Sequence, residues 1–91
     1  MPLPENDWTL LIHPKAEKEL AELEAKNRRL VDRAILELAT DPLAGDVQWL
    51  QPHGLNQYRK RVGRWRIFYD IIKTDRKILI TAIKPRTSTT Y

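Results

Sequence analysis

The chain of 91 residues contains no cysteine, which excludes a disulfide scaffold, a cysteine nucleophile and a zinc site built on thiolates. Glycine is scarce, with three residues, and phenylalanine and methionine occur once each. No apolar run approaches the roughly 18 residues of a membrane span. No basic-then-apolar signal segment opens the sequence. These absences favour a protein of a reducing compartment, and we expect a cytoplasmic location without membrane association.

Acidic residues are scarce in the second part of the chain. Residues 52–91 contain ten lysines and arginines but only Asp70 and Asp75 as acidic residues, a net charge of +8, whereas residues 1–51 carry −4. Hydrophobic residues make up 42% of the whole, so residues 1–91 are expected to form one small folded domain. A domain that gathers its cations in one part is typical of proteins that meet an anionic partner.

Apolar periodicity predicts a strand and two helices in the first part of the chain. The strand covers residues 8–12, and Pro14 is well placed to begin a helix. A break between the helices is expected at residues 27–28. The second helix is expected to end near Thr40, because Pro42 cannot continue a helix. The apolar stripes of the two helices are Ala16, Leu20 and Leu23, then Leu30, Val31, Ala34, Ile35 and Leu38.

The second part is predicted to hold three strands in hairpins. Residues 43–56 are interpreted as a loop that tucks Trp49 and Leu50 against the core. Gly63 and residues 73–76 provide turns of hairpin length. Trp8, Trp49 and Phe68 are expected in the core. The predicted strands cover residues 57–62, 64–72 and 77–84.

The resulting order, β-α-α-β-β-β, predicts an α+β fold. Two consecutive helices with a short connection form a hairpin, and three hairpin-linked strands form an antiparallel sheet. We therefore expect an antiparallel four-stranded sheet with the helical hairpin packed on one face.

Strand alternation places several arginines together. Arg59 and Arg61 point to the face opposite that of Lys60, and a turn at Gly63 could bring Arg66 beside them. Clustered guanidiniums suit phosphate because each is a planar fork that stays charged. Arginines on a solvated strand face are also ordinary, and edge strands carry cations that discourage aggregation. Additional candidate contacts with nucleic acid are Lys60, Arg64, Trp65, Lys84, Arg86 and Tyr91, the two aromatic rings as stacking planes.

A metal site is not expected. His13 and His53 are far apart in sequence and neither belongs to a cluster of ligands. No cofactor motif is present, and the serine and threonines of the tail lack any triad pattern. We expect neither a metal nor a cofactor.

The segment Tyr58-Arg-Lys-Arg-Val-Gly63 followed by Arg64-Trp-Arg-Ile-Phe-Tyr69 resembles the central signature of the RelE/ParE toxin superfamily. The Pro-Lys-Ala-Glu-Lys-Glu-Leu segment from Pro14, Asp41-Pro42 after the helices, and Ile83-Lys-Pro-Arg86 agree with this resemblance, which covers nearly the whole chain. It implies a RelE-like fold and a toxin of a type II toxin–antitoxin pair. RelE-like members are mRNA interferases, that is, ribosome-dependent endoribonucleases that cut mRNA in the A site, whereas ParE-like members act on DNA gyrase.

The resemblance also implies site residues and partners. In a metal-free cleavage the RNA 2′-hydroxyl attacks the adjacent phosphodiester, and the expected catalytic residues are Arg59, Arg61, Arg66, Arg86 and Tyr91. The lysine pair of RelE-type members corresponds to Arg59 and Arg61 in this chain. Arginine is a poor general base because its pKa lies above about 12, so the base is expected from Tyr91 or from the ribosome. The expected partners are a RelB-like antitoxin, the ribosome and mRNA, with operator DNA reached through the antitoxin. Two alternatives remain, a ParE-like gyrase inhibitor and an inactive module that binds RNA or the ribosome.

Overall fold

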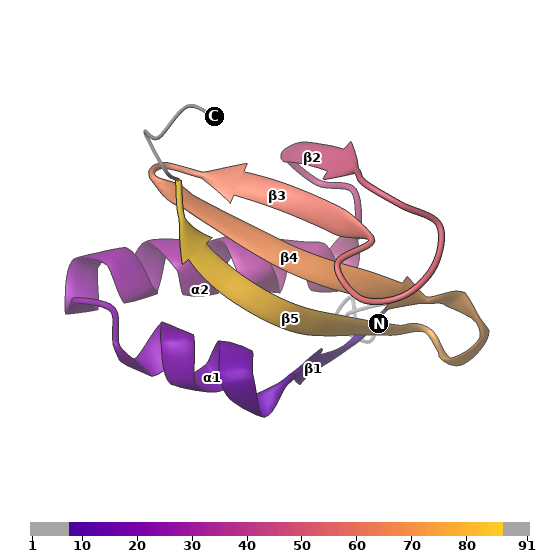
Figure 1. Cartoon of the computed structure of the whole chain (residues 1–91), viewed down its shortest axis with the longest axis horizontal. Coiled ribbons are helices and arrows are strands. Elements are labelled where there is room, and N and C mark those ends of the chain that lie inside the picture. The colour runs from indigo at the N-terminus through magenta and orange to yellow at the C-terminus, as the bar shows by residue number, and fades with distance from the viewer. Residues whose placement is uncertain (1–7, 87–91) are drawn as a thin grey trace, which may run out of the picture.

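The polar and apolar alternation of the second half of the chain builds a twisted sheet, and the amphipathic helices cover one of its faces (Figure 1). The computed structural model describes residues 8–86. Within that range the elements are β1 (Thr9–Ile12), α1 (Pro14–Ala21), α2 (Ala25–Thr40), β2 (Asp46–Trp49), β3 (Tyr58–Val62), β4 (Trp65–Ile72), a 3-10 turn (Lys73–Asp75) and β5 (Lys77–Pro85).

The α+β class and the helical hairpin are confirmed, but the sheet differs from the prediction in two ways. It has five strands, in the order β1-β5-β4-β3-β2, and β1 pairs with β5 in parallel. The additional strand, β2, pairs antiparallel with β3 over only four residues, which is too short to produce a clear alternation in sequence. The direction of β1 was predicted wrongly because no hairpin fixes how it pairs with a strand more than 60 residues later.

The two helices begin and end close to the predicted positions. Pro14 occupies the first turn of α1, and the ring nitrogen Nδ1 of His13 accepts the N–H of Lys15 at 3.1 Å. The break between the helices comes earlier than predicted, since α2 already begins at Ala25. The second helix ends at Thr40 as predicted. Within residues 8–86 neither helix is long and apolar enough to cross a membrane.

The core lies between the helices and the inner face of the sheet. Tyr69 and Leu38 are fully buried there, and Trp8 packs against this cluster as expected. Trp49 was predicted wrongly, because β2 is an edge strand and leaves this side chain 58% exposed. Leu50 is 39% exposed, so it is not tucked against the core as predicted. The fully buried side chains from the sheet include Ile67, Ile78 and Ile80, and those from α2 include Val31.

The hairpin between β3 and β4 fixes the register of the site. Gly63 has a φ of +57°, and Arg64 completes a two-residue turn without a positive φ, the pattern of a type II′ turn. This turn pairs Val62 with Trp65, and every later pair along the hairpin follows from it. The predicted hairpin is therefore confirmed.

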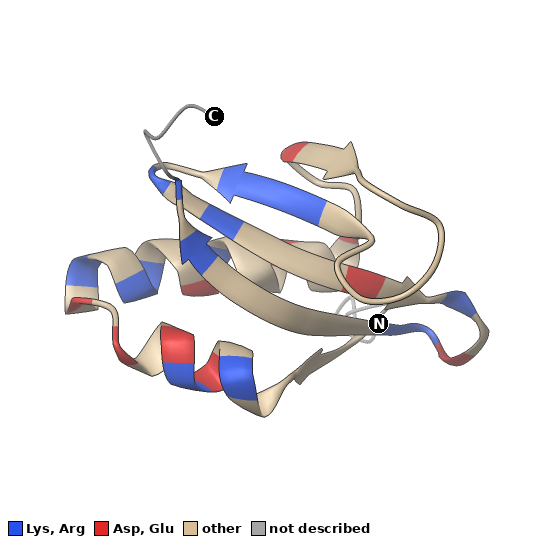
Figure 2. Cartoon of the chain, viewed as in Figure 1, with Lys and Arg blue, Asp and Glu red and all other residues tan. Residues whose placement is uncertain are grey.

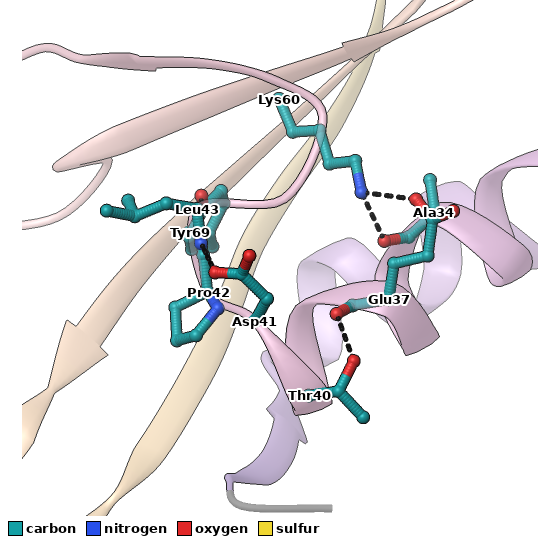
Figure 3. Close-up of polar contacts among 8 residues, drawn as sticks. All are labelled: Ala34, Glu37, Thr40, Asp41, Pro42, Leu43, Lys60 and Tyr69. Atoms are coloured by element: carbon teal, nitrogen blue, oxygen red, sulfur yellow. Dashed lines mark hydrogen bonds and ion pairs between the residues drawn. The ribbon is translucent and has the colours of Figure 1, made fainter.

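A buried lysine ties this hairpin to α2 (Figure 3). Lys60 is 2% exposed, and its Nζ donates to the carboxylate of Glu37 at 2.7 Å and to the carbonyl of Ala34 at 3.0 Å. The hydrogen bond from Lys60 and its charge lower the pKa of Glu37. Tyr69 in β4 adds a second tie, because its hydroxyl donates to the carbonyl of Pro42 at 2.5 Å. Both contacts hold the inner face of the sheet against α2 and the segment that follows it.

Candidate functional site

Charged residues lie side by side on the neighbouring strands β2 to β5 (Figure 2). They lie on the face of the sheet that the helices do not cover, here called the open face. Arg61 of β3 lies directly opposite Arg66 of β4, and Arg66 lies directly opposite Lys84 of β5. Asp46 of β2 lies on the other side of Arg61. Directly paired residues project from the same face of a sheet, so these four side chains form one row across four strands.

Arg59 adds a third guanidinium to the open face. It lies two residues before Arg61 on β3, and strand alternation returns it to the same face. Its Nη2 donates to the side-chain oxygen of Gln48 at 2.6 Å. Arg59, Arg61 and Arg66, here called the arginine cluster, are therefore brought together as predicted.

The arginine cluster is incompletely satisfied among the described residues. The Nε atoms of Arg59 and Arg66 are buried and have no hydrogen-bond partner there. Burial lowers the pKa of Arg59, and the charges of Arg61 and Arg66 lower it further. Like charges gathered on one face make a site whose positive charge a bound oxyanion can balance.

Two carboxylates limit the charge at the ends of the row. The Nε of Arg61 contacts Asp46 Oδ2 at 2.9 Å, with both side chains about half exposed. At the other end, Lys84 forms an ion pair with Glu19 of α1, whose carboxylate also accepts the N–H of Ile83 at 2.8 Å. Burial raises the pKa of Glu19, but the hydrogen bonds from Lys84 and Ile83 outweigh this and lower it overall. Lys84 is thus already paired, which leaves the arginine cluster as the positive centre.

The end of β5 brings another arginine to the same end of the sheet. The backbone N–H of Arg86 donates to the carbonyl of Arg64 at 2.5 Å, and both side chains are exposed. Arg64 is the second residue of the turn that joins β3 to β4. Two cations therefore lie near the turn that joins β3 to β4, displaced from the row along the strand direction. Tyr91, the other expected catalytic residue, lies outside the described residues.

Lys60 and Trp65 do not join this surface. Both belong to the inner face, Lys60 through its buried contacts with α2 and Trp65 through packing against the core. Their expected contacts with RNA are therefore not compatible with their places in the fold, because strand alternation turns them away from the arginine cluster. The indole Nε1 of Trp65 is buried without a hydrogen-bond partner among the described residues.

Three residues of the open face were not predicted to be part of it. Asp46 and Gln48 enter through β2, and Phe68 lies opposite Arg59. Phe68 was expected in the core, but it alternates with Ile67 and Tyr69 and so points away from the helices. The alternation of residues 65–69 was the sequence signal that could have placed Phe68 correctly.

The loop between β2 and β3 is anchored at the end of the open face that lies away from the β3–β4 turn. Asp70 is 5% exposed, and its carboxylate accepts the backbone N–H of Gln57 at 2.8 Å. Burial raises its pKa, while hydrogen bonds from Gln57 and Asn56 counteract this. Thr81 of β5 donates to the side chain of Asn56. Asp70 thus helps to hold the loop between β2 and β3 in place.

Metal binding finds no support in residues 8–86, where no group of three His, Cys, Asp or Glu side chains is arranged to hold an ion. His13 caps α1, and His53 is exposed in the loop before β3.

Residues 10–89 match the model of a protein family described as the ParE toxin of the type II toxin–antitoxin system, parDE. The chain belongs to this toxin family. The resemblance to the RelE/ParE superfamily is confirmed by this match and by the folds below. No curated protein sequence is a significant match.

Solved structures similar to the toxin are RelE proteins. A RelE–RelB complex from Pyrococcus horikoshii contains a chain that is 28% identical, with a TM-score of 0.80 over 91% of the toxin and 99% of that chain. A chain of the RelBE2 toxin–antitoxin complex from Mycobacterium tuberculosis is 20% identical, with a TM-score of 0.75 over 88% and 99%. The isolated RelE toxin of E. coli is 14% identical, with a TM-score of 0.76 over 90% and 87%. The two less similar structures establish the shared fold alone.

Proposed function

We propose that the toxin is a metal-independent endoribonuclease that cuts mRNA in the ribosomal A site. The observation that carries this proposal is the arginine cluster, in which three guanidiniums share the open face and two of them keep buried, unpartnered Nε atoms among the described residues. A phosphodiester of single-stranded RNA supplies the acceptors and the negative charge that this site lacks.

The proposed chemistry takes its nucleophile from the substrate and its charge stabilisation from arginines, so it invokes no metal. The 2′-hydroxyl of one nucleotide attacks the adjacent phosphorus, the bond to the 5′-oxygen of the next nucleotide breaks, and the products are a 2′,3′-cyclic phosphate and a 5′-hydroxyl. Negative charge grows on the phosphorane oxygens during attack. Arg61 and Arg66 stabilise this charge, and a well-placed donor of this kind contributes about 3–4 kcal/mol. Arg59 binds an adjacent part of the phosphate chain.

The residues after β5 complete the proposed site. Arg86 is held by its backbone next to Arg64, which lies in the β3–β4 turn two residues before Arg66. We assign Arg86 to the leaving-group side of the phosphate, Arg64 to the RNA backbone, and Tyr91 to the 2′-hydroxyl, which it orients or deprotonates. Guanidiniums stay protonated at neutral pH and cannot take this proton. The ribosome is the alternative source of the base. Lys84 is proposed as an RNA contact because it lies in the row. Its contribution is expected to be small, since its ammonium group already forms an ion pair with Glu19.

An antitoxin is the proposed protein partner. The Pyrococcus horikoshii RelE is solved with RelB, and its fold is the one described here. An acidic segment of a RelB-like antitoxin covering the arginine cluster would satisfy the same donors as RNA and thereby block it. Operator DNA is assigned to the antitoxin of this toxin, which would bring the toxin to the DNA.

Inhibition of DNA gyrase is the second candidate. The matching family model is that of ParE toxins, and the superfamily's ParE-like members act on that enzyme. In this alternative the open face is a protein contact, and the unpartnered guanidinium donors bind acidic side chains of gyrase.

Two assays with purified toxin separate the candidates. Primer extension on translated mRNA is expected to reveal cuts at A-site codons that disappear with Arg66→Gln, while gyrase supercoiling proceeds normally. Intact mRNA together with blocked supercoiling would replace the nuclease with the gyrase inhibitor. If neither mRNA nor gyrase is affected while the protein binds ribosomes, the inactive binding module is the correct alternative.

A further inference from the structure

Phe68 is an aromatic side chain on a face that is otherwise marked by charge. It pairs directly with Arg59 on β3 and with Ala82 on β5, and it follows Arg66 by two residues on β4. Its immediate neighbours in sequence, Ile67 and Tyr69, are fully buried on the inner face. The ring is partly exposed and projects from the same side of the sheet as the arginine cluster.

The residues next to Phe68 in the sheet are one small side chain and two charged ones. Ala82, opposite on β5, ends in a methyl group. Arg59, opposite on β3, has a Cβ about 5 Å away by the geometry of directly paired residues. Arg66 is two residues along the same strand, a separation of roughly 6.6 Å. One nucleotide is long enough to place its base on the ring and its phosphate at either guanidinium.

Fixing the loop before β3 does not require Phe68. That loop is held by hydrogen bonds from polar groups, Asp70 accepting from Gln57 and Thr81 donating to Asn56. The inner core closes around Ile67 and Tyr69 instead. Phe68 therefore lies between the loop and the arginine cluster, where a planar apolar surface adjoins the unpartnered donors of Arg59 and Arg66.

We propose that Phe68 is the platform on which one base of the bound RNA stacks while the arginine cluster holds the adjacent phosphate. This inference rests on the proposed function and assigns to Phe68 the stacking role that the sequence suggested for Trp65. Stacking on a ring depends on the π face that every base has, so the platform tolerates different bases. The site then recognises a splayed, single-stranded nucleotide, because a base inside a helix cannot reach the ring.

The test compares two short single-stranded RNAs made uncleavable by 2′-O-methylation, one with a full set of bases and one abasic at a single position. Binding to the wild-type toxin, Phe68→Leu, Phe68→Trp and Arg66→Gln is measured by fluorescence anisotropy. Phe68→Leu keeps an apolar side chain but removes the ring. Comparing two RNAs on the same variant cancels any partial loss of folded protein, and a 2-aminopurine base reports stacking through quenching.

We expect Phe68→Leu to weaken binding of the complete RNA by roughly 5- to 150-fold, to leave binding of the abasic RNA unchanged and to abolish the quenching. Phe68→Trp is expected to restore both. The platform is overturned if Phe68→Leu binds the complete RNA and the abasic RNA with the same affinities as wild type. If Arg66→Gln still weakens binding of both RNAs in that case, the proposed RNA site itself survives. If Arg66→Gln binds both RNAs as tightly as wild type, the proposed function fails together with the platform.

Discussion

Arg61 and Arg66 lie directly opposite each other on β3 and β4, with both side chains on the open face of the sheet. Two like charges in direct cross-strand positions destabilise a hairpin. Asp46 offsets part of this repulsion through its contact with Arg61. A pairing that costs stability in the free protein is explained when an anionic ligand binds between the two guanidiniums.

Neutralising one arginine of this pair should reduce catalysis far more than folding. Arg66→Gln is expected to lower the rate of RNA cleavage by about 100- to 1000-fold, because one donor to the developing charge is lost. The melting temperature should rise or stay unchanged, since repulsion within the arginine cluster decreases. Single-turnover cleavage at saturating ribosomes measures the rate. Lys18→Gln, which removes one exposed charge from α1, is the matched control and should cleave normally.

Releasing Arg61 from its carboxylate should strengthen RNA binding. In Asp46→Asn the guanidinium no longer has to exchange an ion pair for the phosphate, and the repulsion between Asp46 and the RNA backbone disappears. A gain of about 1.5- to fivefold in affinity is expected, the size of an exposed ion pair, and it should diminish with added salt. Weaker binding by Asp46→Asn would mean instead that Asp46 positions Arg61 for the phosphate.

The buried lysine next to the arginine cluster should be dispensable for RNA binding. Lys60→Met fills most of the same buried space with an apolar side chain but removes the partner of Glu37 and the donor to the Ala34 carbonyl. Because the Glu37 side chain is 55% exposed and can be solvated, only a modest loss of stability is expected. RNA affinity should stay within about twofold of wild type, measured beside Arg61→Met, which should bind much more weakly. A large loss of affinity in Lys60→Met would contradict the placement of Lys60 on the inner face. Lys60→Ala, by contrast, leaves a cavity and should destabilise the fold by roughly 2–4 kcal/mol.

Stability should fall in acid because two carboxylates have lowered pKa values in the folded state. The hydrogen bonds from Lys60 to Glu37 and from Lys84 and Ile83 to Glu19 make the folded protein hold these protons less tightly than the unfolded chain. Their contribution is therefore complete above the ordinary pKa of 4.5 and is lost as the pH falls through the lower folded values.

Thermal melts from neutral pH down to pH 3 measure this loss. Glu19 and Glu37 together contribute on the order of 1–2 kcal/mol to the free energy of unfolding after allowance for solvent screening. The double variant Glu19→Gln with Glu37→Gln should lose this part of the pH dependence of stability. Asp32→Asn, an exposed position of α2, is the control and should follow the wild-type curve. A double variant with an unaltered acid profile would assign the loss to other carboxylates.

Most of the fold could be predicted because its signals are local. Pro14 and Pro42 delimit the helical hairpin, and Gly63 fixes the turn from which the register of Arg61 and Arg66 follows. The parallel pairing of β1 with β5 could not be predicted, since it joins segments linked by no turn. β2 could not be predicted because four residues are too few for a clear alternation of polar and apolar side chains. The strand is defined by its pairing with β3.

The arginines of the candidate site could be predicted from the sequence, but the residues around them could not. Alternation places Arg59 and Arg61 on one face and Lys60 on the other, and the hairpin turn at Gly63 brings Arg66 beside the two arginines. The contact of Arg61 with Asp46 depends on β2 and therefore on tertiary structure. Phe68 was taken for a core residue because an aromatic side chain within a strand is usually buried, although its alternation with Ile67 already placed it on the open face.

The most direct test of the central claim is the chemical identity of the RNA ends that the purified toxin leaves on ribosome-bound mRNA in the presence of a metal chelator. Mass spectrometry of the fragments should find a 2′,3′-cyclic phosphate and a 5′-hydroxyl, produced by wild type and lost in Arg66→Gln. Intact mRNA under these conditions, or fragments with 3′-hydroxyl and 5′-phosphate ends that form only when metal is restored, would contradict cleavage by the arginine cluster.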